Sequence, residues 1–302
     1  MGVLGRVAQQ PCLGRVGFLP QKLDHHRTGL LRYHSTTGLD PARIRELIAR
    51  IRQTLPDPDR RTGRPPALSL YRSVLLTLVL LRQNLPQTLA ADLFGVSQPT
   101  VSRTLRRYAP LIGRVLRPHT PSLPDLLPRL STVLLDGTLI PTGNRAHPDP
   151  HPTDGTRRRP HPNYNGKHRE QGLSVQILTD HAGRLLAVLT PQPGSTHDSR
   201  AYHHHGLADL LHTTPTIADL GYQGTDAIIP RRKRPGHTHH TPADQAWNTL
   251  ISRHRWPVER AIAHLKNWKI LATGYRARLT ELPTIIRIVT NLEFYRLSQR
   301  HF

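Results

Sequence analysis

Cysteine is almost absent from this sequence, because Cys12 is the only one. A single thiol excludes a disulfide framework and a cysteine-based zinc cluster within one chain. Long hydrophobic runs are absent too. The longest apolar segment extends from Val74 to Leu81, is interrupted by Thr77, and is far shorter than the roughly 20 residues of a membrane-spanning helix. No hydrophobic signal-peptide region follows Met1. We therefore expect a soluble cytoplasmic protein.

Acidic residues are also scarce. The 302 residues include 42 Lys and Arg against 20 Asp and Glu, a formal net charge of +22. A surface this positive attracts polyanions, and nucleic acid is the first candidate because counterion release favours binding to phosphate backbones. Arginine greatly outnumbers lysine, a bias typical of a GC-rich genome, so the charge permits DNA binding without proving it. The length allows one large or two ordinary domains.

The N-terminal region changes character near residue 40. Residues 1–39 show no helical or strand periodicity, and we expect a tail without fixed structure. Asp40-Pro41 then has the pattern of a helix start, and apolar residues recur at helical spacing until about Leu55. This helix opens a helical domain that we place at residues 40–118.

A helix-turn-helix is predicted within that domain. Helices are expected at about 70–82, 87–94 and 98–111, with Gly95-Val96-Ser97 forming the turn before the last. Val101 and Leu105 would face neighbouring helices. The polar and basic residues of the last helix would face a DNA groove, and they are Gln98, Thr100, Ser102, Arg103, Arg106 and Arg107. The alternative is a small helical bundle with a solvated basic face.

The region over residues 125–302 has a different rhythm, with strands expected at 132–135, 173–179, 185–189 and 214–218. A hairpin turn at 180–183 joins the second and third strands, and a helix at about 197–211 separates the third and fourth. Strand, hairpin, helix and strand, followed by later helices, is the order of an RNase H-like α/β fold. In that order the fourth strand lies beside the first.

Two aspartates close these neighbouring strands. Asp136 ends the first strand and Asp219 ends the fourth, so both side chains are expected at one edge of the sheet. Two adjacent carboxylates repel each other unless a cation lies between them. The candidate for a third acid is Glu259, on a helix whose apolar positions share one face. Oxygen ligands select hard cations, so we expect two Mg²⁺ per site, with Mn²⁺ as a substitute.

These motifs together resemble the DDE transposases of bacterial insertion sequences, in particular the insertion-sequence-five group related to the eukaryotic Harbinger transposases. The resemblance rests on "DGT" at Asp136, "DLGY" from Asp219, and Arg255, Glu259 and Lys266 with three and six residues between them. It covers about residues 65–302. The resemblance implies Asp136, Asp219 and Glu259 as catalytic, metal-binding acids. It also implies cleavage of DNA at terminal inverted repeats, followed by strand transfer in a homo-oligomer that holds two ends.

Some positions keep alternative interpretations. The family often has a tyrosine three positions before the arginine, where this chain has Ser252. Pro257 predicts a helix that begins near that residue, and Glu259 would then also suit a helix-capping role. Asp198, in the family-like segment "PGSTHDS", is the rival metal ligand, although an aspartate there also caps a helix. We expect Asp219 to hold the metal, with Asp198 as a possible further ligand.

Three cations near these acids are candidates for holding DNA phosphates: Lys167, Arg255 and Lys266. The alternative for each is an ordinary solvated basic face. Two other functions stay open beside transposition. One is an RNase H-like nuclease that cleaves without strand transfer, and the other is a domesticated or inactive relative that acts as a DNA-binding regulator.

Overall fold

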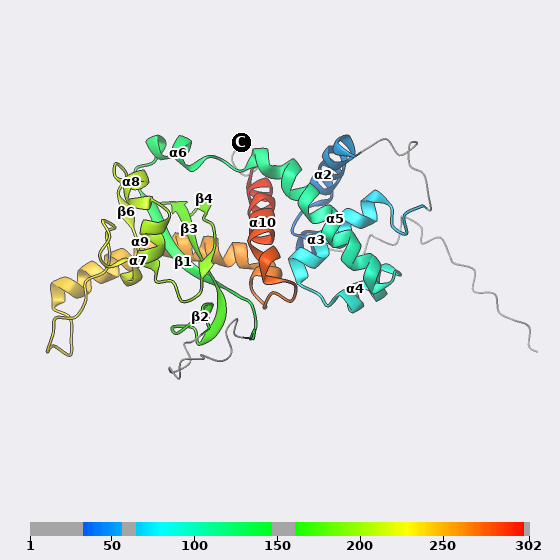
Figure 1. Cartoon of the computed structure of the whole chain (residues 1–302). Helices are drawn as coiled ribbons and strands as arrows, with labels where there is room; N and C mark the ends of the chain where they lie inside the picture. The colour runs from blue at the N-terminus through cyan, green and yellow to red at the C-terminus, as the bar shows by residue number, and fades with distance from the viewer. Residues whose placement is uncertain (1–32, 56–64, 147–160, 299–302) are drawn as a thin grey trace, which may run out of the picture. The chain divides into compact units, whose positions relative to one another are not determined.

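The computed structural model describes residues 33–55, 65–146 and 161–298 (Figure 1). Its N-terminal part consists of α1 (Tyr33–Thr37), α2 (Pro41–Thr54), α3 (Leu70–Gln83), α4 (Gln87–Phe94) and α5 (Gln98–Leu116). The Asp40 side chain accepts a hydrogen bond from the Arg43 amide at 3.0 Å and so caps α2. Gly95, in the left-handed conformation, ends α4 and forms the turn to α5. The predicted helix-turn-helix order is confirmed.

The stretch that precedes α2 differs from the prediction. Residues 1–32 lie outside the described residues, but 33–39 are structured, so the expectation of an unstructured tail is wrong there. Leu39 is fully buried, and the Gln83 amide donates a hydrogen bond to the Ser35 carbonyl at 2.7 Å. The Trp268 ring packs directly against Gly38. These partners are distant in sequence, which explains why local periodicity does not reveal the segment.

A mixed sheet forms the second part of the chain. Its strands are β1 (Val133–Pro141), β2 (Tyr164–Asn165), β3 (Glu170–Asp180), β4 (Leu185–Val188), β5 (Gln192–Pro193) and β6 (Thr216–Ile217). Strand β1 is antiparallel to β3 and parallel to β6, while β4 pairs with the other side of β3 in an antiparallel hairpin. This arrangement confirms the predicted RNase H-like α/β fold.

Several predicted boundaries need correction. Strand β1 continues to Pro141, so Asp136 lies within the strand and does not end it. Strand β6 comprises only Thr216 and Ile217. The single helix expected over 197–211 is two helices, α7 (Asp198–His204) and α8 (Leu207–Leu211), because Gly206 adopts a left-handed conformation between them.

The helix that carries Glu259 also differs from the prediction. Helix α9 extends from Pro242 to Lys266 and passes through Pro257, whereas a start near Pro257 was expected. Proline removes one helical hydrogen bond, but tertiary contacts hold the helix across it. The turn between β3 and β4 packs against α9, where Gly183 meets Pro257 and the Arg260 side chain donates to the Ala182 carbonyl at 3.0 Å. Glu259 is therefore a mid-helix residue.

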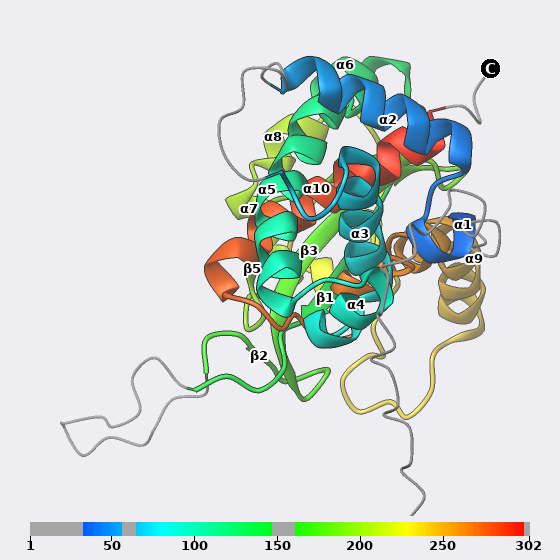
Figure 2. The same ribbon diagram turned by 90° about the vertical axis from the view of Figure 1, so that its right-hand side faces the viewer.

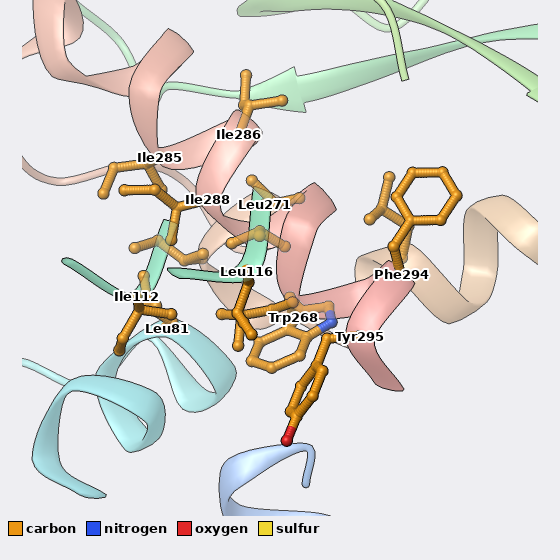
Figure 3. Close-up of a cluster of buried hydrophobic side chains, with 14 of the residues drawn as sticks. Leu81, Ile112, Leu116, Trp268, Leu271, Ile285, Ile286, Ile288, Phe294 and Tyr295 are labelled. Atoms are coloured by element: carbon orange, nitrogen blue, oxygen red, sulfur yellow. The ribbon is translucent and has the colours of Figure 1, made fainter. Parts of the chain in front are cut away.

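Helix α10 (Leu282–Leu297) lies between the N-terminal helices and the sheet (Figures 1 and 2). One hydrophobic cluster includes residues from both parts of the chain, and Figure 3 shows its centre, where Ile112 and Leu116 of α5 meet Ile285 and Ile288 of α10. The short helical turns η3 (Arg117–His119), α6 (Leu123–Leu126) and η4 (Leu127–Arg129) connect α5 to β1. The remaining turns are η5 (Leu220–Tyr222), η6 (Lys269–Leu271) and η7 (Leu279–Glu281).

Candidate active site

Asp136 lies within β1, and Asp219 lies two residues beyond the end of the neighbouring strand β6. Strands β1 and β6 are paired in parallel with Val133 opposite Thr216 and Leu134 opposite Ile217, and the same register continued by two residues brings Asp136 level with Asp219. Their side chains are 14% and 19% exposed. The parallel pairing of β6 with β1 thus brings together the two aspartates, as predicted.

Asp198 reaches the same place from the other face of β1. Alternate residues of a strand point to opposite faces. Leu134 belongs to the hydrophobic cluster that includes α9, so Asp136 shares that face, whereas Leu135 belongs to the cluster that includes α7 and α8. A Cβ atom added at Gly137 would lie 2.5 Å from Asp198 Oδ1. Glycine therefore leaves the space through which the Asp198 carboxylate approaches β1.

A second glycine brings Asp198 close to Asp219. A Cβ atom at Gly221 would lie 2.6 Å from Asp198 Oδ2 and 2.9 Å from Asp219 Oδ1. The Gly221 amide donates a hydrogen bond to Asp219 Oδ1 at 2.8 Å. The "DLGY" segment thus holds one carboxylate and gives room to another.

Burial and neighbouring charges shift the pKa values of Asp136 and Asp198. Burial, together with the nearby Asp219 and Asp198, raises the pKa of Asp136 to about 6, against the lowering effects of Arg255 and of the Gly137 amide. Burial, together with Asp219, also raises the pKa of Asp198. The site therefore disfavours the charged forms of Asp136 and Asp198, chiefly because both carboxylates are buried.

Two of the predicted DNA-binding cations contact these acids. An Arg255 guanidinium nitrogen lies 3.1 Å from Asp136 Oδ2, and Arg255 is only 14% exposed. Its Nε atom is buried and has no hydrogen-bond partner among the described residues. Lys167, which is largely exposed, places its ammonium group 3.9 Å from Asp219. Both side chains reduce the repulsion between the carboxylates.

Glu259 and Lys266 lie farther along α9. Glu259 is exposed and lies one helical turn after Arg255, which places it on the same side of the helix. Lys266 is half-buried, and burial lowers the pKa of its ammonium group while Glu170 raises it. The role of Glu259 as a metal ligand and the role of Lys266 in holding DNA phosphates thus stay predictions.

Gln176 and Tyr222 are further residues of the site, and sequence reasoning gave neither a role. The Gln176 amide nitrogen donates a hydrogen bond to the Asp198 carbonyl at 2.9 Å and another to the Tyr222 hydroxyl at 3.3 Å. Tyr222 is fully buried; burial and the three aspartates hold the pKa of its hydroxyl well above the usual value, so the hydroxyl keeps its proton. The sequence offers one signal for Gln176, because a polar glutamine is unexpected within the largely apolar strand β3.

Helix α5 exposes most of the predicted DNA-binding residues. Gln98, Arg103, Arg106 and Arg107 are exposed, whereas Thr100 and Ser102 are half-buried. Val101 is fully buried and Leu105 packs partly against the core, as predicted. Ser97 precedes the helix, and its hydroxyl contacts the Thr100 hydroxyl at 3.0 Å.

Two absences apply to the described part of the chain. Within residues 33–55, 65–146 and 161–298, no three His, Cys, Asp or Glu side chains form a ready-made metal cluster. Over the same ranges, no helix combines the length and apolarity that crossing a membrane requires.

The fold and the acids define a class of nucleic-acid-processing enzyme, and comparisons with known proteins identify the family. The family of DDE superfamily endonucleases matches residues 135–293, and the helix-turn-helix of DDE superfamily endonucleases matches residues 66–118. A Streptomyces albus G protein, assigned as the transposase for insertion sequence element IS112, is 30% identical over 236 residues, or 78% of this chain and 83% of that protein. This chain belongs to the DDE superfamily of endonucleases.

Solved structures give only a distant likeness. The Mos1 strand transfer complex is 16% identical, with 83% of this chain and 82% of that chain covered and a TM-score of 0.23. The Mos1 paired-end complex with the left transposon end is 16% identical, with 82% of each chain covered and a TM-score of 0.22. The predicted resemblance is confirmed for the DDE superfamily, and assignment to the insertion-sequence-five group stays a prediction.

Proposed function

We propose that this protein is the transposase of an insertion sequence, which binds the terminal inverted repeats of its element, cleaves DNA there and transfers the strand to a target. The observation that carries this proposal is the meeting of Asp136, Asp198 and Asp219 beside β1, in a chain with a helix-turn-helix. Residues 40–118 would bind DNA and residues 125–302 would catalyse. Two element ends must be held together for transposition, so we propose a homo-oligomer on DNA.

The donor set fits divalent metal ions. Carboxylate oxygens are hard ligands, and Asp136 is a buried acid with two further acids beside it, an arrangement that a bound cation would stabilise. We propose Asp136 and Asp219 as principal ligands for two Mg²⁺, with Glu259 and Asp198 as the candidates that complete the set. Bound metal at such a site supplies activation of the attacking hydroxyl and stabilisation of the leaving oxygen in phosphoryl transfer.

Other residues of this chain would position the acids and the DNA. Gln176 fixes the backbone at Asp198, and Gly137 and Gly221 leave room for its carboxylate. Lys167, Arg255 and Lys266 are proposed to hold DNA phosphates beside the acids. The Arg255 guanidinium is paired with the Asp136 carboxylate in this structure. To hold a DNA phosphate, it must contact the phosphate in addition to Asp136 or leave Asp136.

The test is cleavage of a duplex that carries the gene's own flanking inverted repeat, with Mg²⁺ present. Asp136→Asn and Asp219→Asn should each lower cleavage at the repeat boundary by at least about 100-fold, because an amide cannot replace a charged oxygen ligand. Binding of the same duplex should be unchanged. Asp125→Asn, at an exposed acid on α6, is the matched control and should cleave normally.

A second measurement separates metal binding from activity. Mn²⁺ should raise the unfolding temperature of the wild type through binding to the native state, and Asp136→Asn should abolish this rise. Boundary cleavage without joining to a target would favour the nuclease alternative. Specific binding with no cleavage by the wild type would favour the regulator and contradict the transposase proposal.

A further inference from the structure

A cavity of about 940 Å³ lies beside helix α5, the helix predicted to bind DNA, and none of the three aspartates lines it. One wall is α5, which contributes Gln98, Ser102 and Arg106 at successive helical turns. The opposite wall is the segment from Tyr275 to Glu281, between η6 and α10. Apolar side chains of α3, α5 and α10 form the floor. Half of the α5 residues predicted to bind DNA therefore face a second, separate element across this cavity.

The rim of the cavity is positively charged. Arg106, Arg276 and Arg278 are exposed, and the side chain of each forms no ion pair or hydrogen bond with a residue that the structure describes. The acid of the lining is Glu281, and burial together with this carboxylate raises the pKa of the Tyr275 hydroxyl. Three unpaired guanidinium groups around one opening favour an anionic occupant with regularly spaced charges.

The segment that carries Arg276 and Arg278 is held firmly on both sides. Asn84, which ends α3, donates hydrogen bonds to the Thr273 hydroxyl at 2.8 Å and to the Gly274 carbonyl at 3.0 Å. The Arg145 guanidinium, which follows β1, donates to the carbonyls of Tyr275, Ala277 and Thr142. The backbone that carries the two exposed arginines is thus fixed before binding. A fixed backbone lowers the conformational entropy that is lost when a ligand binds.

We propose that this cavity holds the sugar–phosphate backbone of the DNA duplex that α5 reads, with Arg276 and Arg278 each neutralising a phosphate across from Arg106. The inference rests on the proposed function, because it assumes that α5 lies against DNA. It adds a second DNA-binding element from the far end of the chain, beyond the helix-turn-helix. Phosphate contacts of this kind position the protein on the duplex and carry no sequence information.

The test is the salt dependence of binding to the inverted-repeat duplex and to a scrambled duplex of equal length. For Arg276→Ala/Arg278→Ala, the slope of log K against log salt should become shallower by roughly 2, because two phosphate contacts are lost. Affinity should fall roughly 10–100-fold at about 0.1 M salt, and equally for both duplexes. Arg276→Lys/Arg278→Lys should restore most of the slope, since lysine keeps the charge.

The matched control is Arg52→Ala/Arg129→Ala, which removes the same formal charge from exposed positions outside the cavity. This variant should keep the wild-type slope. The proposal is overturned if the cavity variant behaves like the control, and also if only repeat binding weakens, because the arginines would then read sequence. In either case, cleavage of the repeat by the wild type would leave the proposed function standing. No DNA binding by the wild type would overturn both.

Discussion

Asp136 shows how one residue can reveal a site before any ligand is known. It is an acid within a buried strand, and the free energy of keeping it charged is high because burial removes its carboxylate from water and two more acids lie nearby. Arg255 offsets this cost only in part. The pairing of Asp136 with Asp219 could be predicted from strand order alone. The contribution of Asp198 could not, because it depends on how α7 packs on β1.

The raised pKa of Asp136 predicts how stability depends on pH when metal is chelated. The pKa is about 6 in the folded protein against 3.8 as the ordinary value, so the folded state binds more protons and stability falls as pH rises from about 4 through 6. Asp136→Asn, which is permanently neutral, should raise the free energy of unfolding by about 2–3 kcal/mol at pH 7 and by almost nothing below about pH 4. Urea unfolding with EDTA at both pH values measures this. Equal effects at the two pH values, or the same effect from Asp125→Asn, would contradict it.

At the scale of elements, the contact between helix α7 and strand β1 decides where the third acid lies. Gly137 occupies the point of contact, since Asp198 at the start of α7 fills the space of its missing side chain. The glycine of the "DGT" motif is visible in the sequence, but its partner is not. Tertiary packing also decides where helix α9 begins. The packing of Gly183 on Pro257 overrides the local tendency of proline to begin a helix.

Gly137→Ala is therefore expected to displace the Asp198 carboxylate. It should lower stability by about 1–3 kcal/mol through overpacking and should reduce cleavage at least 10-fold. Adding Asp198→Ala to Gly137→Ala should recover most of the stability but none of the activity, because the clash disappears together with the acid. Gly166→Ala is the control, since a Cβ there has open space. Additive stability effects in the double variant would show that the two residues do not touch.

At the scale of the whole molecule, the helical and catalytic parts share one hydrophobic cluster. The sequence places their boundary between residues 118 and 125, and it gives no sign that α10, from the end of the chain, packs between them. Hydrophobic periodicity reports local structure, so it cannot predict contacts between residues that are hundreds of positions apart. Trp268 illustrates it, because its indole nitrogen donates to Glu293 while Gly38 packs on its ring.

This shared core predicts a single unfolding transition. Tryptophan fluorescence reports on the core through the buried Trp268. Urea unfolding curves from this fluorescence and from far-ultraviolet circular dichroism should coincide. A fragment of residues 65–118 should fail to fold alone, because the faces of α3 and α5 that contact α10 would be exposed. A separate early loss of helix, or a cooperatively folded fragment, would show instead that the helical region is independent.

Arg145 links the end of strand β1, which carries Asp136, to the backbone that faces α5. The number of base pairs between the bases that are recognised and the phosphate that is cut is then set by the protein and not by a flexible tether. A duplex turns once in about 10 base pairs, so roughly five extra base pairs between the two points would present the opposite side of the helix to the acids. The natural ends of the element would therefore keep a constant distance between recognition sequence and terminus.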